Sequence, residues 1–247
     1  MIVKVCGVRD PQIAELAVDA GADWIGLVFE PRSPRCVDEA QADAVVEAVA
    51  GRADLVGVLL DPSAELCDQL ATRFRLSAVQ VHGRGVDAGL LAECTVPVIR
   101  GVNVASAEEA YHIDWPPSGL VLLDAAPEAQ DALPGGTGRR VPTEWAQGVA
   151  RHRRIVLAGG LGPESVADAV ESVHPYGVDA SSGLESSPGV KDPDKVRAYV
   201  RTARAAFDVV ASQGERWRSP LQANAGVGES PAEGPRQRKD GQEKRRA

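Results

Sequence analysis

The feature that most restricts the fold of this chain is a short apolar run followed by a helical or turn-bounded segment, repeated eight times. The strand-like runs fall at residues 2–6, 23–29, 54–59, 77–81, 96–100, 119–123, 154–158 and 176–180. Strands that alternate with helices imply right-handed parallel crossovers. Eight such units in about 205 residues match a small closed barrel and exceed the usual strand number of an open doubly wound sheet. The sequence therefore predicts an α/β fold, a single (β/α)8 TIM barrel.

The first repeat illustrates how a helix of this barrel is bounded. Asp10 or Pro11 is suited to begin the helix, and Gly21 is suited to end it. Between them, apolar residues recur at helical spacing, at Ile13, Leu16, Ala17 and Ala20. We therefore expect a helix between the first two strands.

The end of the chain differs in composition from the rest. From about Asp208 the apolar periodicity stops, and Ser, Gly, Pro, Gln and charged residues prevail through Ala247. Such a composition buries too little apolar area to offset the entropy of ordering. We expect a barrel domain over residues 1–207 and a disordered, net basic extension over residues 208–247.

Charge and cysteine usage argue against several classes of protein. The formal net charge of −8 is unfavourable for a nucleic-acid-binding surface on the folded part. No apolar run is long enough to cross a bilayer, and we expect neither a membrane segment nor a secretory signal peptide. The four cysteines lack a CxxC pair and the four histidines lack metal-site spacing. We expect free thiols, no bound metal and a cytoplasmic protein.

Two strands end in residues with useful chemistry, Cys6 after the first strand and Asp124 after the sixth. In a barrel of parallel strands the reactive groups lie at the carboxyl ends of the strands, so both side chains belong to one candidate site. Cys6 alone is also compatible with a small buried core residue, and Asp124 with a loop cap. The segment 125–141 is longer than typical loops of this kind and favours a loop that closes over a ligand.

Small residues follow the last two strands, Gly159 and Gly160 after the seventh and Ser181, Ser182 and Gly183 after the eighth. Small side chains let backbone N–H groups approach an anion, and a helix that begins nearby adds the positive end of its dipole. Barrels commonly bind phosphate at these two loops. The sequence therefore predicts that these five residues bind a phosphate group.

Several motifs, in chain order from residue 2 to about residue 205, resemble those of the phosphoribosylanthranilate isomerases. They include Lys4-Val5-Cys6-Gly7, Ser33-Pro34-Arg35, Val79-Gln80-Val81-His82-Gly83, Leu122-Leu123-Asp124-Ala125, Gly135-Gly136-Thr137-Gly138, Leu157-Ala158-Gly159-Gly160-Leu161, Asp179-Ala180-Ser181-Ser182-Gly183-Leu184-Glu185 and Pro188-Gly189-Val190-Lys191-Asp192. The resemblance implies an Amadori rearrangement in tryptophan biosynthesis that needs no cofactor. Its substrate is a phosphorylated aminosugar, N-(5-phosphoribosyl)anthranilate, and its product is 1-(2-carboxyphenylamino)-1-deoxyribulose 5-phosphate.

The resemblance also implies roles for individual residues. Asp124 is expected to act as the general acid that opens the ribose ring, and Cys6 as the general base at C2′. Arg35 is expected to bind the anthranilate carboxylate, because a guanidinium matches a carboxylate in two-point geometry. For these roles burial should raise the pKa of Asp124, while nearby positive charge should favour the Cys6 thiolate. Possible loop or ribose contacts are Gly136, Thr137 and Asp179.

Three places depart from the family pattern and leave the substrate range open: Val8-Arg9 in place of a common threonine, Cys36 in place of an aromatic residue, and the basic pair Arg139-Arg140. Two other functions also stay open. One is the related aminoimidazole-carboxamide ribotide isomerase reaction, which is usually associated with paired aspartates. The other is an inactive phosphate-binding barrel that serves as a scaffold. The sequence does not determine the oligomeric state, the protein partners, the role of the extension, or a primary as against a specialised pathway.

Overall fold

The computed structural model describes residues 1–83, 86, 88–116, 118–126 and 140–213. Eight parallel strands close into a barrel in chain order, with β8 paired to β1. The strands are β1 (Ile2–Cys6), β2 (Trp24–Val28), β3 (Asp54–Leu60), β4 (Ala78–His82), β5 (Val98–Val104), β6 (Val121–Ala125), β7 (Ile155–Leu157) and β8 (Gly177–Ala180). The predicted (β/α)8 barrel is confirmed.

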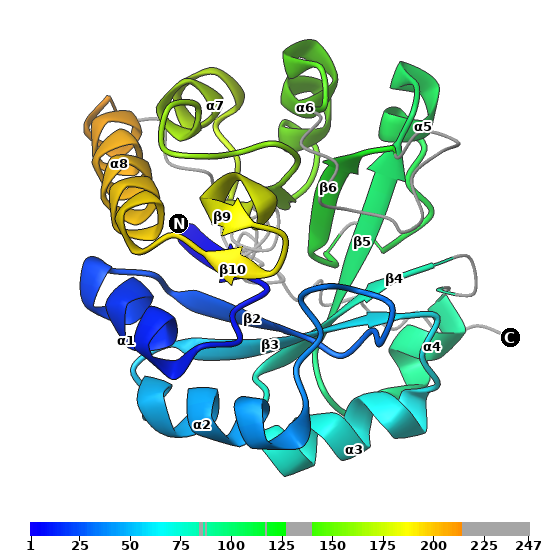
Figure 1. Ribbon diagram of the computed structural model, residues 1–247. Helices are drawn as coiled ribbons and strands as arrows, with labels where there is room; N and C mark the ends of the chain where they lie inside the picture. The colour runs from blue at the N-terminus through cyan, green and yellow to red at the C-terminus, as the bar shows by residue number, and fades with distance from the viewer. Residues whose placement is uncertain (84–85, 87, 117, 127–139, 214–247) are drawn as a thin grey trace, which may run out of the picture. The chain divides into compact units, whose positions relative to one another are not determined.

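Helices follow the strands and form a ring outside the barrel (Figure 1). They are α1 (Pro11–Ala20), α2 (Glu39–Val49), α3 (Ala64–Phe74), α4 (Ala88–Glu93), α5 (Ala107–Tyr111), α6 (Thr143–Ala150), α7 (Val166–Val173) and α8 (Pro193–Ser212). Between β8 and α8 the chain adds a short 3-10 helix, η1 (Ser182–Leu184), and an antiparallel pair, β9 (Glu185–Ser187) and β10 (Val190–Lys191). The sequence did not predict this pair.

Helix α1 forms as its sequence predicts. The Asp10 side chain accepts a hydrogen bond from the Gln12 N–H at 2.8 Å, which satisfies one of the free donors of the first turn. Pro11 occupies the first helical position, and the helix ends at Gly21 in the left-handed conformation. Ile13, among others, faces the core and is buried.

Strand β5 is the one strand that extends well beyond its predicted end, to Val104 rather than residue 100. Polar residues interrupt its apolar pattern, but each has a structural partner. The guanidinium of Arg100 lies 5.7 Å from the ring centroid of Trp115, and the Asn103 side chain donates to the Ala125 carbonyl at 3.1 Å. Contacts with distant residues thus continue a strand that local polarity suggested would end.

Alternation along the strands creates two hydrophobic clusters. The larger lies between the strands and the surrounding helices, and the smaller fills the interior of the barrel. The interior cluster consists of Val56, Ala78, Ile99, Leu122, Val156 and Ala158. Further along the same inward faces the side chains become polar, with Lys4, Gln80, His82, Asp124 and Asp179 all buried. Inside the barrel, a polar region therefore lies between the apolar interior cluster and the carboxyl ends of the strands.

Helix α8 continues past residue 207, the predicted end of the barrel domain. The helix runs to Ser212, and Val210 is buried at 2% exposure. Phe207 and Val210 are three residues apart on one face, so the apolar stripe continues for another turn although Asp208 and Val209 between them are exposed. Residues 214–247 lie outside the described part of the chain, and the disordered extension stays a prediction there.

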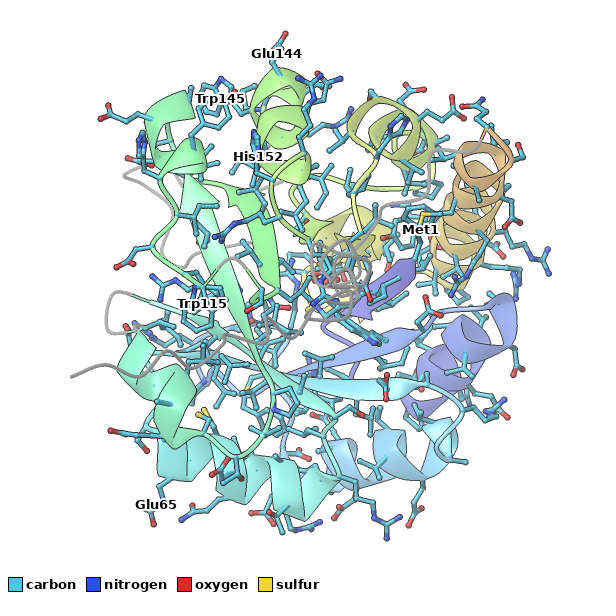
Figure 2. All side chains as sticks on the ribbon, turned by 180° about the vertical axis from the view of Figure 1, so that it is seen from behind. Met1, Glu65, Trp115, Glu144, Trp145 and His152 are labelled. Atoms are coloured by element: carbon cyan, nitrogen blue, oxygen red, sulfur yellow. The ribbon has the colours of Figure 1, made fainter. Side chains whose placement is uncertain are left out.

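The two views look at opposite ends of the barrel. In Figure 1 the β9 and β10 pair that follows β8 lies toward the viewer. In Figure 2, seen from behind, Met1 lies toward the viewer just before the start of β1. Across the described segments, no helix combines the length and apolar character needed to span a membrane.

Candidate active site

Cys6 and Asp124 both lie at the carboxyl end of the barrel. Cys6 is the last residue of β1, and Asp124 is the last but one of β6. Each is about 6% exposed, and both side chains lie on the inward faces of their strands. Since all eight strands run in the same direction, the expectation that these two strands share one sheet and one polarity is confirmed.

The thiol of Cys6 fits against β2 because its partner there is a glycine. Cys6 and Gly26 are directly opposed in the β1–β2 pairing. A Cβ atom at Gly26 would lie only 2.8 Å from the Cys6 sulfur. Gly26 thus provides the space that the side chain of Cys6 occupies.

A buried ion pair lies beside Cys6 inside the barrel. The Lys4 ammonium donates to Asp179 Oδ2 at 3.0 Å, and the two residues are directly opposed on β1 and β8. The positive charge of Lys4 also acts on the Cys6 thiol. Burial acts to lower the pKa of Lys4, but Asp179 and Cys6 outweigh it and leave this pKa above its ordinary value. Lys4 is therefore a cation in the interior of the barrel.

The pKa of the Cys6 thiol is raised above its ordinary value. Burial is the main cause, and the charge of Asp179 acts in the same direction. Lys4 and Lys191 act to lower this pKa but do not overcome burial. The expectation that Cys6 and Asp124 shift in opposite directions is therefore wrong for this structure. The positive charges are present as expected, but desolvation of the thiolate exceeds their effect.

The pKa of Asp124 is raised to about 6. Burial of the carboxyl group is the main cause, and the charge of Asp179 adds to it. The Ala125 N–H donates to Asp124 Oδ1 at 2.7 Å, and this hydrogen bond acts in the opposite direction. A carboxyl group with a pKa near 6 retains a protonated fraction close to neutral pH, which suits a general acid.

The glycine-rich loops after β7 and β8 touch each other. A Cβ atom at Gly183 would lie 2.1 Å from the Leu161 carbonyl oxygen, so the close approach requires a glycine. Gly159 and Gly160 both have positive φ, at 87° and 59°. The Ser181 hydroxyl donates to the Cys6 carbonyl at 3.1 Å. The structure thus brings the two predicted phosphate loops together beside the end of β1.

Arg35 already has a carboxylate partner within the protein. Its Nε and Nη2 donate to Oε1 and Oε2 of Glu185 at 2.7 and 2.9 Å, which forms a two-point ion pair. Lys191 donates to the same Glu185 Oε1 at 2.9 Å and to the Ser181 carbonyl at 2.9 Å. One edge of the Arg35 guanidinium is therefore engaged, and the edge formed by Nη1 and Nη2 is the one that another carboxylate would meet.

Glu185 and Lys191 were missed as functional residues. Both belong to motifs that carry the family resemblance, but nothing in their spacing indicates that they meet Arg35, 150 positions away in the case of Glu185. Arg32, the nearest alternative to Arg35 in sequence, pairs with Glu30 at 2.6 Å, and its side chain is 65% exposed. The structure therefore places Arg35, and not Arg32, next to the two loops.

His82 lies on the inward face of β4 with Gln80. Gln80 Nε2 and His82 Nε2 are 2.8 Å apart, as expected for residues two positions apart on one face of a strand. Burial lowers the pKa of His82 to about 4, with the charge of Lys4 acting in the same direction. His82 is therefore neutral at physiological pH, in agreement with a structural histidine.

The residues that depart from the family pattern do not all line the site. Val8 is fully buried in the outer core and so cannot face the barrel mouth. Arg9 donates to the Pro34 carbonyl at 3.0 Å and so contacts the loop that carries Arg35. Cys36 forms an isolated parallel bridge with Val28. Gly136, Thr137 and Arg139 lie outside the described residues, so their predicted contacts stay predictions.

A cleft of about 400 Å³ lies elsewhere, between α5 and the end of α6. It is lined by Ala110, Tyr111, Ile113, Gly148, Val149, Arg151, His152 and Arg153. His152, labelled in Figure 2, follows α6 and precedes β7, so it lies at the end of the barrel opposite Cys6. Within the described ranges, no cluster of three or more His, Cys, Asp or Glu side chains is arranged to hold a metal ion.

Comparisons with known proteins agree with this arrangement. The family model described as N-(5'-phosphoribosyl)anthranilate (PRA) isomerase matches residues 3–202. The enzymes of that name from Afipia carboxidovorans and Paramagnetospirillum magneticum are each 38% identical, over 83% and 82% of this chain and 90% and 96% of their own lengths.

Solved structures give the same relationship. A phosphoribosyl anthranilate isomerase in complex with reduced 1-(o-carboxyphenylamino)-1-deoxyribulose 5-phosphate is 29% identical, with a TM-score of 0.72. The alignment covers 83% of this chain and 100% of that one. The isomerase from Thermus thermophilus is 31% identical, with a TM-score of 0.71, over 83% of this chain and 99% of its own.

Proposed function

Because the chain belongs to the N-(5'-phosphoribosyl)anthranilate isomerase family, we propose a role for each of its site residues in the reaction of that family. The protein is an isomerase of tryptophan biosynthesis. It converts N-(5-phosphoribosyl)anthranilate into 1-(2-carboxyphenylamino)-1-deoxyribulose 5-phosphate. The observation that most supports our assignment is that Cys6, Asp124 and the two glycine-rich loops all lie at one end of the barrel. The family match also favours this reaction over the related ribotide isomerisation and over a scaffold.

The phosphate group of the substrate binds between the loops that follow β7 and β8. Backbone N–H groups of Gly159, Gly160, Ser181, Ser182 and Gly183 are the proposed donors. The contact between Gly183 and Leu161 supports this assignment, because it holds the two loops close enough to surround one anion. The Lys191 ammonium, 2.9 Å from the Ser181 carbonyl, adds positive charge beside the loop.

Asp124 donates the first proton. Protonation of the ribose ring oxygen breaks its bond to C1′, and the anthranilate nitrogen and C1′ form a protonated Schiff base. The Asp124 pKa of about 6 supports this role, because a buried carboxyl group near its pKa both holds and releases a proton. The carboxylate that remains is stabilised by the Ala125 N–H.

Cys6 removes the second proton. Its thiolate takes the proton from C2′, and the electrons of that bond neutralise the Schiff base to give an enolamine. Tautomerisation of the enolamine gives the ketone of the product. The positive charge of Lys4 supports the thiolate form of Cys6.

Arg35 and Asp179 orient the substrate. The Nη1–Nη2 edge of Arg35 is proposed to bind the anthranilate carboxylate, while Glu185 holds the other edge. Asp179 uses Oδ2 for Lys4, whereas its Oδ1 is buried without a hydrogen-bond partner among the described residues. A buried unpartnered acceptor is costly, so a ribose hydroxyl is the proposed donor to Oδ1.

The test is the activity of single variants on freshly generated phosphoribosylanthranilate. Cys6→Ser and Asp124→Asn should each lower kcat by about 10² to 10⁴, the usual effect of removing a positioned acid or base. Cys94→Ser serves as a control and should retain wild-type turnover. Wild-type turnover in either of the first two variants removes that residue from the mechanism.

The cytoplasm remains the predicted location, because all four cysteines are free thiols.

A further inference from the structure

Cys6 can act as a base only as a thiolate, yet its side chain is buried, which disfavours that charged form. We propose that Lys4 is a positioning residue that stabilises the Cys6 thiolate, and that Asp179 keeps Lys4 charged and directed toward the site. The inference rests on the proposed role of Cys6 as the general base. It assigns a function to a buried lysine that does not touch the substrate.

Geometry places Lys4 directly below Cys6. The two residues are two positions apart on β1, so their side chains leave the same, inward face of the strand. Lys4 is completely buried, and its ammonium donates to Asp179 at 3.0 Å. A lysine is rarely buried to this degree without a specific partner. The ion pair with Asp179 therefore holds the ammonium on the inward face that also carries Cys6.

Among the described residues, four ionisable groups from four elements of the fold interact electrostatically with Cys6. They are Lys4 on β1, Asp179 on β8, Lys191 on β10 and Tyr199 on α8. From β2 the facing residue is Gly26, which carries no charge. Tyr199 is neutral, because burial raises its pKa well above the ordinary value. The candidates for stabilising a thiolate are therefore the two lysines.

Of these two lysines, Lys4 has the stronger influence on Cys6. The Lys191 ammonium is shared between Glu185 at 2.9 Å and the Ser181 carbonyl at 2.9 Å, so its charge is largely directed elsewhere. The only carboxylate partner of Lys4 in the described part of the chain is Asp179, and the charge of Lys4 favours the Cys6 thiolate more strongly than that of Lys191 does. Asp179 disfavours the thiolate, but its effect on Cys6 is smaller than that of Lys4. The pair as a whole therefore favours ionisation of the thiol.

The role of Asp179 follows from the cost of burying an isolated ammonium. Without a counter-charge, a fully buried lysine loses its proton near neutral pH. Asp179 prevents this loss, and the pKa of Lys4 stays above its ordinary value. The carboxylate therefore acts on Cys6 indirectly, by maintaining the cation beside it.

The experiment measures the ionisation of Cys6 directly in the Lys4→Met variant. The rate of iodoacetamide alkylation is followed against pH, with Cys6 distinguished from the other cysteines by peptide mass spectrometry. We expect the pKa of the Cys6 thiol to rise by about one unit or more, the usual effect of removing an opposite charge at this range. At pH 7, kcat should fall about tenfold and recover toward higher pH, while KM changes less than about twofold. Lys195→Met, which removes an ammonium bonded to the Glu185 carbonyl, is the matched control and should leave the alkylation profile unchanged.

A second variant keeps the test informative if Lys4→Met does not fold. Lys4→Met leaves Asp179 as a buried charge without its partner, so the double variant Lys4→Met/Asp179→Asn is measured alongside. Its Cys6 pKa should lie between those of Lys4→Met and the wild type. An unchanged alkylation profile in a folded variant, judged by circular dichroism, overturns the role of Lys4. The wild type could lack isomerase activity while Lys4→Met still shifts the alkylation profile. That result supports the electrostatic role of Lys4 and counts against the proposed function instead.

Discussion

Replacing Asp124 by asparagine should make the protein more stable although it lowers kcat. The pKa of Asp124 is raised from the ordinary value of 3.8 to about 6, mainly by burial, so the folded state holds this proton more tightly than the unfolded state. Stability therefore falls as pH rises from about 4 to about 6 and stays lower above that range. A pKa shift of about two units lowers the free energy of unfolding at pH 8 by about 3 kcal/mol. An asparagine has no such cost, and its Oδ1 can still accept the Ala125 N–H.

The assay is urea unfolding of the wild type and of Asp124→Asn at pH 5 and at pH 8. The variant should be more stable by up to about 3 kcal/mol at pH 8, and by about half as much at pH 5, where the carboxyl is largely ionised in the unfolded chain but still largely protonated in the folded one. In a protein of this size the gain at pH 8 corresponds to about 5 to 10 °C in Tm. Asp114→Asn, at an exposed position, is the control and should change neither value. Equal stability of Asp124→Asn and wild type at both pH values would refute the argument that desolvation of this carboxylate strains the fold.

Two further predictions concern substrate binding. Arg35→Ala should raise KM by about 10-fold to 100-fold, the effect of losing a two-point hydrogen bond to a charged group. If KM is unchanged in Arg35→Ala but raised in Arg32→Ala, the assignment is reversed. Gly183→Ala should weaken binding of substrate and of inorganic phosphate at least tenfold, because its Cβ would lie 2.1 Å from a backbone carbonyl oxygen and force the two loops apart. Gly162→Ala, whose Cβ would meet nothing closer than 3.4 Å, should bind phosphate normally in the same titration.

Local sequence patterns were sufficient to predict the barrel and to place Cys6 and Asp124 at one end of it. Each strand is a short apolar run because it is buried between an interior plug and an outer shell of helices, and each helix shows its own period and caps. The parallel direction of the strands then required Cys6 and Asp124 to share one end. The glycines after β7 were visible for a similar reason, because positive φ at Gly159 and Gly160 favours glycine whatever surrounds it.

The misplaced end of α8 shows where local reading fails. The apolar periodicity was expected to stop at Asp208, whereas Val210 continues the buried face of the helix. Similarly, β5 continues past its predicted end at residue 100 and through Asn103. There the Asn103 side chain donates to the Ala125 carbonyl on β6, a contact with a residue outside the local window that the pattern alone did not indicate.

The amino-acid sequence by itself determined the order of the strands, the end of the barrel that carries the site, and the residue types available there. Only the tertiary structure decided which charges meet: Lys4 with Asp179 across 175 positions, and Arg35 with Glu185 across 150. It also decided that burial raises the pKa values of Cys6 and Asp124 together. The physical reason is that backbone periodicity depends on near neighbours in the chain, whereas desolvation and Coulomb interaction depend on distance in space, which closure of the barrel sets.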